Sequence, residues 1–243
     1  MPKNLFFDLD HTIWDFEGNA NETLKELYEM YNIAQYSNNT VNDFLSTYHK
    51  VNDKYWALYR QHKVKKEVLR SIRFTETFEL MGMPLNAVPE NIWKVYLDIC
   101  PTKTRLMPGA IETLDYLNGK YNLHLITNGF AETQKRKLKH SGLEKFFDTL
   151  TISEEVGVQK PHPVIFKKAL ENAKSTLKTG QYVGDNPIAD VLGGLNSDWK
   201  VYWYNPENKD LETELLANSN LKILSHLKEL VEPSNKKKEL KKY

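Results

Sequence analysis

The sequence predicts an α/β protein with a doubly wound parallel sheet and an all-helical domain inserted into it. Over residues 1–14 and about 105–231, short apolar segments alternate with helical patterns, which is typical of parallel strands covered by helices on both faces. Residues 16–103 carry helical patterns and no convincing strand. We therefore expect an α/β core of residues 1–15 and 104–231, a helical domain of residues 16–103, and a disordered lysine-rich tail of residues 232–243.

The expected strands are short apolar runs bounded by polar or turn residues. They are Leu5–Phe7, Leu123–Thr127, Thr149–Ile152, Gln181–Val183 and Val201–Tyr204. Helical patterns lie near 109–120, 131–141, 162–174, 188–197 and 220–231. Gly142 is expected just past the end of one helix, and Asn186-Pro187 at the start of another, with Asn as the cap and Pro in the first turn.

The inserted segment shows helical patterns near 20–31, 41–61, 65–81 and 88–99. Aromatic residues recur in it at three- and four-residue steps, as at Phe44, Tyr48, Tyr55, Trp56 and Tyr59. This spacing predicts the core of a helix bundle rather than a platform for stacking bases.

Composition bounds the possible functions of this 243-residue chain, in which 40% of residues are hydrophobic and 27% are charged. The net charge is +1, but the segment 233–243 alone holds five lysines and one glutamate, so the remainder is acidic. That balance argues against a specific nucleic-acid partner. The single cysteine, Cys100, excludes an intrachain disulfide, and no apolar stretch approaches 18 residues. We expect a cytoplasmic protein with no secretory signal and no membrane partner.

Two aspartates follow the first expected strand, one residue apart. Asp8 and Asp10 would lie at the carboxyl end of that strand, where open α/β sheets bind ligands. Two carboxylates crowded there repel each other unless a cation or a proton lies between them. The spacing therefore indicates a divalent metal, an acid–base pair, or both.

Polar residues also follow three later strands. Thr127 and Asn128 precede a glycine and a helix, a setting that suits an anion such as phosphate. Lys160 could balance the charge of a phosphate and of carboxylates. Asp185 could supply a further oxygen ligand to a hard cation, and Asp190 follows five residues later.

In this chain order the set resembles the haloacid dehalogenase superfamily of aspartate-nucleophile phosphotransferases, whose Rossmann-like core carries an inserted helical cap. The resemblance implies that Asp8 is the nucleophile and Asp10 the general acid and base. It implies that Thr127 and Asn128 bind the phosphoryl group and that Lys160 offsets its charge. It also implies an Mg²⁺ ion held by Asp8, the Asp10 backbone carbonyl and Asp185, with Asp190 in support, directly or through water; Thr12 would shape the loop.

Further segments are similar to the branch of noncanonical pyrimidine 5′-nucleotidases. They are Ile126–Phe130, Ile152–Val158, Val51–Trp56 and Arg73-Phe74. The resemblance implies a phosphomonoesterase acting on nucleoside monophosphates as a monomer or homodimer, with Arg73 or an aromatic such as Phe16 facing the nucleoside. The alternatives are a sugar-phosphate phosphatase, a phosphoglucomutase of the same fold, or a non-catalytic binding protein. Dehalogenases of this fold lack an aspartate at the place of Asp10, so its presence favours phosphate chemistry.

Overall fold

The computed structural model describes residues 3–36, 38–84, 86 and 89–231. The expected lysine-rich tail at 232–243 lies outside the described residues. The chain divides into two compact units: an α/β unit made of the residues up to Phe16 and from Thr104 onward, and a helical unit of Glu17–Lys103. Each unit is described by itself.

One parallel sheet organises the α/β unit in the described part of the chain. Its strands run in the order β3-β2-β1-β4-β5-β6. The strands are β1 (Lys3–Phe7), β2 (Tyr121–Thr127), β3 (Thr149–Ile152), β4 (Gln181–Gly184), β5 (Lys200–Tyr204) and β6 (Leu221–Leu224). The predicted doubly wound sheet is therefore confirmed, with all five expected strands present within two residues of their predicted bounds.

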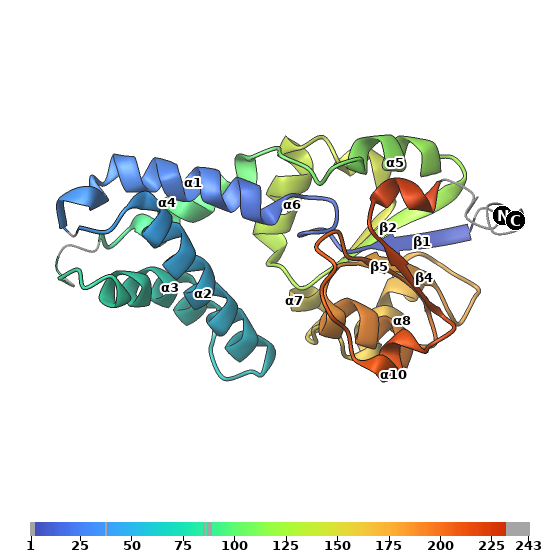
Figure 1. Ribbon diagram of the computed structural model, residues 1–243. Coiled ribbons are helices and arrows are strands. Elements are labelled where there is room, and N and C mark those ends of the chain that lie inside the picture. Colours follow the sequence, from blue (N-terminus) through green and yellow to red (C-terminus); the bar gives the residue numbers. More distant parts are fainter. Residues whose placement is uncertain (1–2, 37, 85, 87–88, 232–243) are drawn as a thin grey trace, which may run out of the picture. The chain divides into compact units, whose positions relative to one another are not determined.

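Helices cover the sheet on both sides (Figure 1). On one side lie α5 (Ala110–Leu117) and α6 (Ala131–His140), and on the other lies α8 (Pro163–Asn172). The remaining helices of this unit are the short α7 (Ser153–Val156), α9 (Gly193–Asn196) and α10 (Thr213–Leu216), the π-helix Pro187–Leu192 and the 3₁₀ turns Glu144–Phe146 and Leu227–Leu230. Gly142 lies just past α6 with a φ of 66°, as expected for a residue that ends a helix there.

The strand order places a topological switch point between β1 and β4. From β1 the chain winds outward to β2 and β3, and it then returns to form β4, β5 and β6 on the other side. Phe7 is level with Val183 of β4 and with Leu125 of β2, and the Asp8 amide donates to the Val183 carbonyl at 2.8 Å. In open α/β sheets ligands bind beyond the carboxyl ends of strands at such a point.

An aromatic cluster supports β1 and β4 from the α8 side. Phe6, Tyr182, Phe166 and Trp199 are all buried, and the Trp199 ring centroid lies 4.8 Å from that of Phe6 and 5.3 Å from that of Phe166. Burying each such ring contributes about 1.5–3 kcal/mol. Gly180 makes room for this packing, because a Cβ there would lie 2.8 Å from the Trp199 ring.

Two expected elements differ from the structure. The helix predicted near 220–231 is wrong: Leu221–Leu224 form the edge strand β6, paired with β5, and only a 3₁₀ turn follows at Leu227–Leu230. The apolar residues of that stretch fit the period of a helix as well as that of a strand, and hydrogen bonding to β5 stabilises the strand. The helix expected near 188–197 is a π-helix continued by α9, and Asn186 caps it as predicted through bonds from the Ile188 and Ala189 amides.

The helical unit contains α1 (Phe16–Met30), α2 (Val41–Arg60), α3 (Lys66–Leu80) and α4 (Ile92–Ile99), with 3₁₀ turns at Ile33–Tyr36 and Cys100–Thr102. Phe44 and Tyr48 of α2 are fully buried, and their rings contact Phe78 and Phe74 of α3. The expected aromatic core is thus confirmed at the start of α2. Further along that helix, Tyr55, Trp56 and Tyr59 are only half-buried.

Candidate active site

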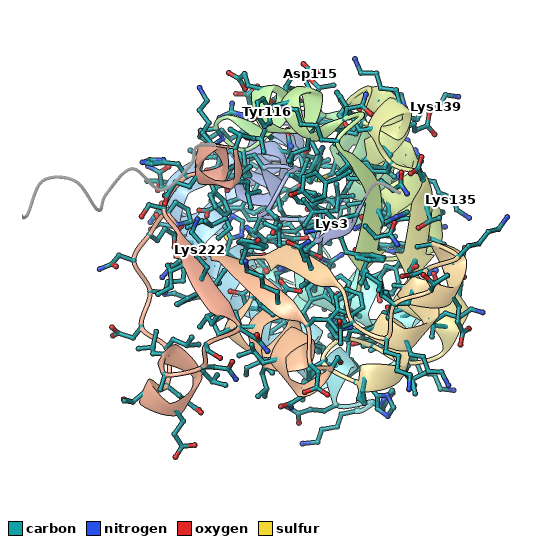
Figure 2. The ribbon with its side chains drawn as sticks, turned by 90° about the vertical axis from the view of Figure 1, so that its right-hand side faces the viewer. Lys3, Asp115, Tyr116, Lys135, Lys139 and Lys222 are labelled. Atoms are coloured by element: carbon teal, nitrogen blue, oxygen red, sulfur yellow. The ribbon has the colours of Figure 1, made fainter. Side chains whose placement is uncertain are left out.

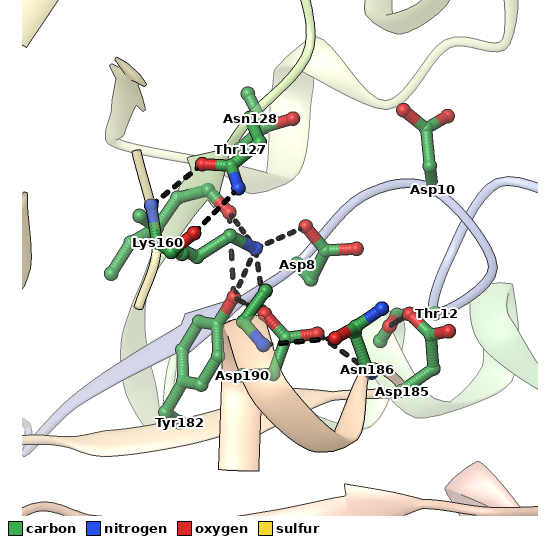
Figure 3. Close-up of polar contacts among 12 residues, drawn as sticks. Asp8, Asp10, Thr12, Thr127, Asn128, Lys160, Tyr182, Asp185, Asn186 and Asp190 are labelled. Atoms are coloured by element: carbon green, nitrogen blue, oxygen red, sulfur yellow. Dashed lines mark hydrogen bonds and ion pairs between the residues drawn. The ribbon is translucent and has the colours of Figure 1, made fainter. Parts of the chain in front are cut away.

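The polar residues predicted from the sequence gather at the carboxyl ends of the strands (Figure 3). Asp8 directly follows β1, Thr127 ends β2, and Asp185 follows β4. Asp190 lies on the π-helix after β4, and Lys160 lies shortly before α8. Residues from Asp8 to Asp190 are therefore brought together by the parallel sheet.

Lys160 is the centre of the group and is only 2% exposed. Its Nζ lies 2.6 Å from Asp8 Oδ1 and 2.7 Å from Asp190 Oδ1. The same ammonium lies 2.7 Å from the Tyr182 hydroxyl and 3.1 Å from the Ile126 carbonyl oxygen. Tyr182 in turn donates to Asp190 Oδ1 at 2.8 Å. These contacts fix the ammonium between two carboxylates.

Local structure holds Asp190 in place. Its Oδ2 accepts the Asn186 amide at 2.9 Å, while Oδ1 faces Lys160 and Tyr182. Gly184 is required beside it, because a Cβ at that position would lie 2.5 Å from the Asp190 carboxylate. A π-helix is often found at functional sites, and here it carries Asp190.

Asn128 braces the segment that carries Lys160. Its amide nitrogen donates to the Lys160 carbonyl at 3.0 Å, and its Oδ1 accepts the Lys160 backbone amide at 2.8 Å. The bond between Lys160 and Pro161 is cis. Thr127 Oγ1 accepts the Gly129 amide at 3.1 Å. The roles of Thr127 and Asn128 in phosphate binding stay predictions.

The carboxylate of Asp10 lies apart from the group around Lys160, as Figure 3 shows. Its Oδ1 lies 2.6 Å from Lys137 Nζ, and its Oδ2 accepts from Gln134 Nε2 at 2.9 Å. Both donors come from α6. Between Asp10 and Thr12 the chain turns through His11, whose φ of 62° is unusual for a residue with a side chain. The two aspartates therefore occupy different environments although they are one residue apart.

Gln134, Lys137 and Tyr182 were not predicted as site residues. Gln134 and Lys137 are three residues apart and so share a face of α6, but a lysine and a glutamine on a helix are usually solvated. Tyr182 alternates with apolar residues in β4 and suggests a core position. Burial of Gln134, Lys137 and Tyr182 at 0%, 3% and 0% exposure is the signal that only the structure supplies.

Burial and mutual repulsion shift the acidity of the clustered groups. Burial raises the pKa of Asp8 well above the usual aspartate range, the attraction of Lys160 opposes this, and the charges of Asp190 and Asp185 raise it further. Burial and the charge of Asp190 raise the pKa of Asp185 to about 7. Burial alone would lower the pKa of Lys160, but the carboxylates of Asp190 and Asp8 outweigh it and raise the pKa. The site thus holds more negative charge than one ammonium balances.

This excess of negative charge fits a divalent cation. Asp8, Asp185 and Asp190 each offer an oxygen, and these oxygens lie within 4.8 Å of one another. Oxygen donors of this kind suit Mg²⁺, which takes one or two carboxylates together with water and substrate oxygens. Thr12 Oγ1 donates to Asp185 Oδ1 at 3.3 Å, and this contact leaves Asp185 Oδ2 for a ligand. The carboxylate of Asp10 is not part of this group. That the backbone carbonyl of Asp10 is a ligand of the metal stays a prediction.

Metal binding is expected to depend on pH. Because the pKa of Asp185 is raised from 3.8 to about 7, the folded metal-free protein binds a proton more tightly than the unfolded chain. Its stability should therefore fall as the pH rises from about 4 to about 7. Added Mg²⁺ should raise the melting temperature more at about pH 8 than at about pH 5, since the metal competes with protons.

Thermal unfolding with chelator or with magnesium, at both pH values, measures this dependence. Asp185→Asn is the matched variant, and it should reduce both the pH slope of the metal-free protein and the magnesium shift, while the raised pKa of Asp8 leaves part of the slope. A melting temperature that rises with pH in chelator, or an equal magnesium shift at both pH values, would contradict the expectation.

The two residues considered for nucleoside binding lie in different units. Arg73 is buried in the helical unit, where its NH1 donates to Asn52 Oδ1 at 2.6 Å. Its guanidinium carbon lies 5.7 Å from the centroid of the Tyr48 ring and 5.8 Å from that of Tyr96. Phe16 instead contacts the rings of His11 and Trp14 at the edge of the α/β unit.

A doubly wound sheet with buried carboxylates and a lysine at its carboxyl edge is the arrangement of an α/β protein with a ligand site at its switch point. The profile of the family described as haloacid dehalogenase-like hydrolase matches residues 5–204, and the chain belongs to that family. The resemblance recognised from the sequence motifs is thereby confirmed.

Similar proteins match nearly the full length of the chain. Pyrimidine 5′-nucleotidase YjjG of Escherichia coli (strain K12) is 30% identical, with 93% of this chain and 96% of the relative covered. Pyrimidine 5′-nucleotidase PynA of Streptococcus pneumoniae (strain ATCC BAA-255 / R6) is 28% identical, with 92% of each covered. The solved structure of Bacillus subtilis YfnB bound to magnesium is 26% identical, with a TM-score of 0.81 and 94% and 96% of the two chains covered.

No helix among the described residues has the length and apolar character needed to cross a membrane.

Proposed function

We propose that this hydrolase is a Mg²⁺-dependent phosphomonoesterase that removes phosphate from nucleoside 5′-monophosphates, with pyrimidine nucleotides preferred. The observation that carries the proposal is the separation of two neighbouring aspartates. Asp8 is paired with Lys160 in the acidic group, whereas Asp10 is held by Lys137 and Gln134. Two carboxylates in different environments can take the different roles of nucleophile and acid–base.

In the first step an oxygen of Asp8 attacks phosphorus, and the bond between phosphorus and the leaving alcohol oxygen breaks. The leaving oxygen takes a proton from Asp10, so that the nucleoside departs as an alcohol. Asp8 is suited to attack because the contact of its Oδ1 with Lys160 directs the carboxylate. Thr127 would donate its hydroxyl hydrogen to an oxygen of the transferring group.

In the second step water attacks the phosphorus of the aspartyl-phosphate and gives a proton to Asp10. The bond to Asp8 breaks, inorganic phosphate leaves, and both aspartates return to their starting states. Splitting one slow hydrolysis into two displacements lowers each barrier, and Lys160 stabilises the charge on the phosphoryl oxygens in both.

Asp8 and Asp185 would hold Mg²⁺, together with the backbone carbonyl of Asp10, and Asp190 would support the site. When bound, the ion supplies positive charge that offsets the phosphate oxygens and the crowded carboxylates. The distances among the three carboxylates and the raised pKa values of Asp8 and Asp185 support this part of the proposal.

The preference for nucleotides is supported by similarity over both units. Two relatives named pyrimidine 5′-nucleotidases match more than nine-tenths of this chain, including the helical unit. The branch-like segments around Asn52 and Arg73 meet in a hydrogen bond of 2.6 Å. That Arg73 faces the nucleoside stays a prediction, since its side chain is 4% exposed and its guanidinium donates to the Leu69 carbonyl and to Asn52.

A panel of phosphomonoesters with magnesium tests the proposal. Uridine and thymidine monophosphates should be hydrolysed with a higher kcat/KM than hexose phosphates or p-nitrophenyl phosphate. Arg73→Gln in the same panel should reduce the ratio of kcat/KM for nucleotides to that for the other esters, mainly by raising KM for the nucleotides. Better turnover of hexose phosphates would replace the nucleotidase with a sugar-phosphate phosphatase, and conversion of one hexose phosphate into its isomer would indicate a mutase.

Trapping separates an enzyme from a binding protein. Beryllium fluoride with magnesium mimics the aspartyl-phosphate and should protect the chain from thermal unfolding. Absence of turnover for every ester, together with absence of a magnesium-dependent fluoride complex, would leave a non-catalytic binding protein as the remaining reading.

A further inference from the structure

We infer that Lys137, assisted by Gln134, is a positioning residue that fixes the carboxylate of Asp10 for proton transfer. The inference rests on the proposed phosphomonoesterase function and extends it to a residue outside the strand-end motifs. Lys137 and Gln134 reach Asp10 from α6, one to each carboxylate oxygen, at 2.6 and 2.9 Å.

Lys137 is held firmly enough to act as an anchor. It is 3% exposed, and its Nζ lies 4.3 Å from the centroid of the Trp14 ring and 5.3 Å from that of Phe16. A buried ammonium is costly unless it is paired, and Asp10 is the carboxylate that pairs with it. The aromatic rings restrict the path of the lysine side chain, so the ion pair sets the direction of the Asp10 carboxylate.

Lys135 and Lys139 of the same helix show that burial is specific to this position. Both point outward from α6 (Figure 2). Lys135 is exposed and pairs with Glu155 at 3.0 Å. Lys137 differs from these two lysines because its side chain is buried and is paired with the carboxylate of Asp10.

Gln134 links Asp10 to the predicted phosphate-binding residue. Its Nε2 lies 2.9 Å from Asp10 Oδ2 and 2.7 Å from Thr127 Oγ1, so one amide nitrogen spans the acid–base group and the phosphate-binding hydroxyl. Exchanging the nitrogen and oxygen of this amide would place an oxygen against the Asp10 carboxylate, which fixes its orientation. Gly129 leaves the space, since a Cβ there would lie 2.4 Å from the Gln134 side chain.

This arrangement matters because Asp10 must reach the leaving oxygen in one step and the attacking water in the next. A short aspartate on a loop has several rotamers, and only a narrow range places an oxygen within about 3 Å of both. Two donors from a rigid helix remove the unproductive rotamers before substrate binds. Lys137 itself touches neither substrate nor phosphorus in this scheme.

The test compares Lys137→Met with Lys135→Met in the full-length chain with saturating magnesium. Each variant is assayed on uridine monophosphate, whose alkoxide leaving group needs a proton, and on p-nitrophenyl phosphate, whose leaving group does not. The parameter is kcat/KM, because it reports only the steps up to release of the leaving group. The same substitutions are made in an Asp10→Asn background.

Lys137→Met should lower kcat/KM for uridine monophosphate by about 10-fold or more, and that for p-nitrophenyl phosphate by less than about 3-fold. Asp10→Asn should lower kcat/KM for uridine monophosphate by at least about 10²-fold. Adding Lys137→Met to it should cost little more, since the lysine acts through the aspartate. Lys135→Met should match the wild type on both esters.

A merely structural role would lower both esters equally and would act additively with Asp10→Asn, and either result overturns the inference. Should Lys137→Met not fold, Lys137→Gln takes its place, because it keeps a buried polar group and removes the charge. A wild-type protein that hydrolyses neither ester overturns the proposed function as well, whereas normal wild-type turnover with an unchanged ester ratio in Lys137→Met overturns only the inference.

Discussion

Asp8→Asn is expected to abolish turnover of phosphomonoesters, with a loss of at least about 10⁴-fold in kcat, because the amide cannot form the aspartyl-phosphate. The loss should be similar for p-nitrophenyl phosphate and for nucleotides, since in the proposed mechanism every ester reacts with the Asp8 carboxylate. Steady-state assays on both esters measure it.

The same variant should fold without loss of stability. Burial and neighbouring carboxylates raise the pKa of Asp8, so its ionised form is costly in the metal-free protein at neutral pH. An asparagine keeps the shape and removes the charge, and its Oδ1 can still accept from Lys160. We expect a metal-free melting temperature at about pH 8 that equals or exceeds that of the wild type, and a smaller shift on adding Mg²⁺.

Asp115→Asn is the matched control, because Asp115 is an exposed aspartate on α5 (Figure 2). It should change neither turnover nor the magnesium shift. Retention of more than about one-hundredth of wild-type turnover by Asp8→Asn would show that this carboxylate is not the nucleophile.

The strand-end residues could be placed from the sequence because the physics of a parallel sheet is simple. Each apolar run ends in a polar residue, and the carboxyl ends of parallel strands meet at one edge, so Asp8, Thr127 and Asp185 had to lie near each other. Lys160 lies on no strand, and its position depends on the brace by Asn128, which pattern alone does not reveal.

The partners of Asp10 could not be predicted in the same way. Lys137 and Gln134 belong to a helix whose sequence, Ala131–His140, is strongly polar and indicates a solvated surface. Lys137 is buried against the Trp14 ring, and Gln134 packs beside Gly129 and Thr127, contacts that the sequence of the helix does not reveal. Tyr182 was hidden for the opposite reason, because a tyrosine among apolar strand residues suggests a core position.

Periodicity was weakest where elements are short or irregular. The four residues of β6 and the π-helix at Pro187–Leu192 both interrupt patterns that fit ordinary helices. Pairing with β5 decides the first, and in the second the Asp190 side chain accepts the amide of Asn186, four residues earlier, an interaction that apolar periodicity does not reveal. The helix and strand propensities of the individual residues therefore predict neither β6 nor the π-helix.

The second large effect is expected from Lys160→Met. This substitution leaves Asp8, Asp185 and Asp190 crowded without their shared ammonium. Removing one partner of a buried ion pair typically costs about 3–5 kcal/mol, and we expect a loss of that size in chelator at about pH 8. Activity should fall by about 10²-fold or more, since the proposed mechanism assigns this charge to stabilising the phosphoryl oxygens.

The loss of stability should depend on pH in a definite direction. Lys160 lowers the pKa values of Asp8 and Asp185, so its removal raises both further. The folded variant then binds more protons than the unfolded chain over a wider range, and its stability falls more steeply as the pH rises above about 4. The difference from the wild type should be small at about pH 5 and large at about pH 8. Lys168→Met, at an exposed lysine on α8, should stay within about 0.5 kcal/mol at both.

A double variant separates the structural from the catalytic part of this lysine. In Lys160→Met with Asp190→Asn, the carboxylate that lies 2.7 Å from the ammonium is neutralised together with it, so most of the lost stability should return. Turnover should not return, because Asp190→Asn supplies no positive charge to the phosphoryl group. Denaturant unfolding and steady-state kinetics on the same preparations measure the two quantities. If stability and turnover both recovered, Lys160 would serve only to neutralise Asp190. If neither recovered, the main interaction of Lys160 would be the one with Asp8.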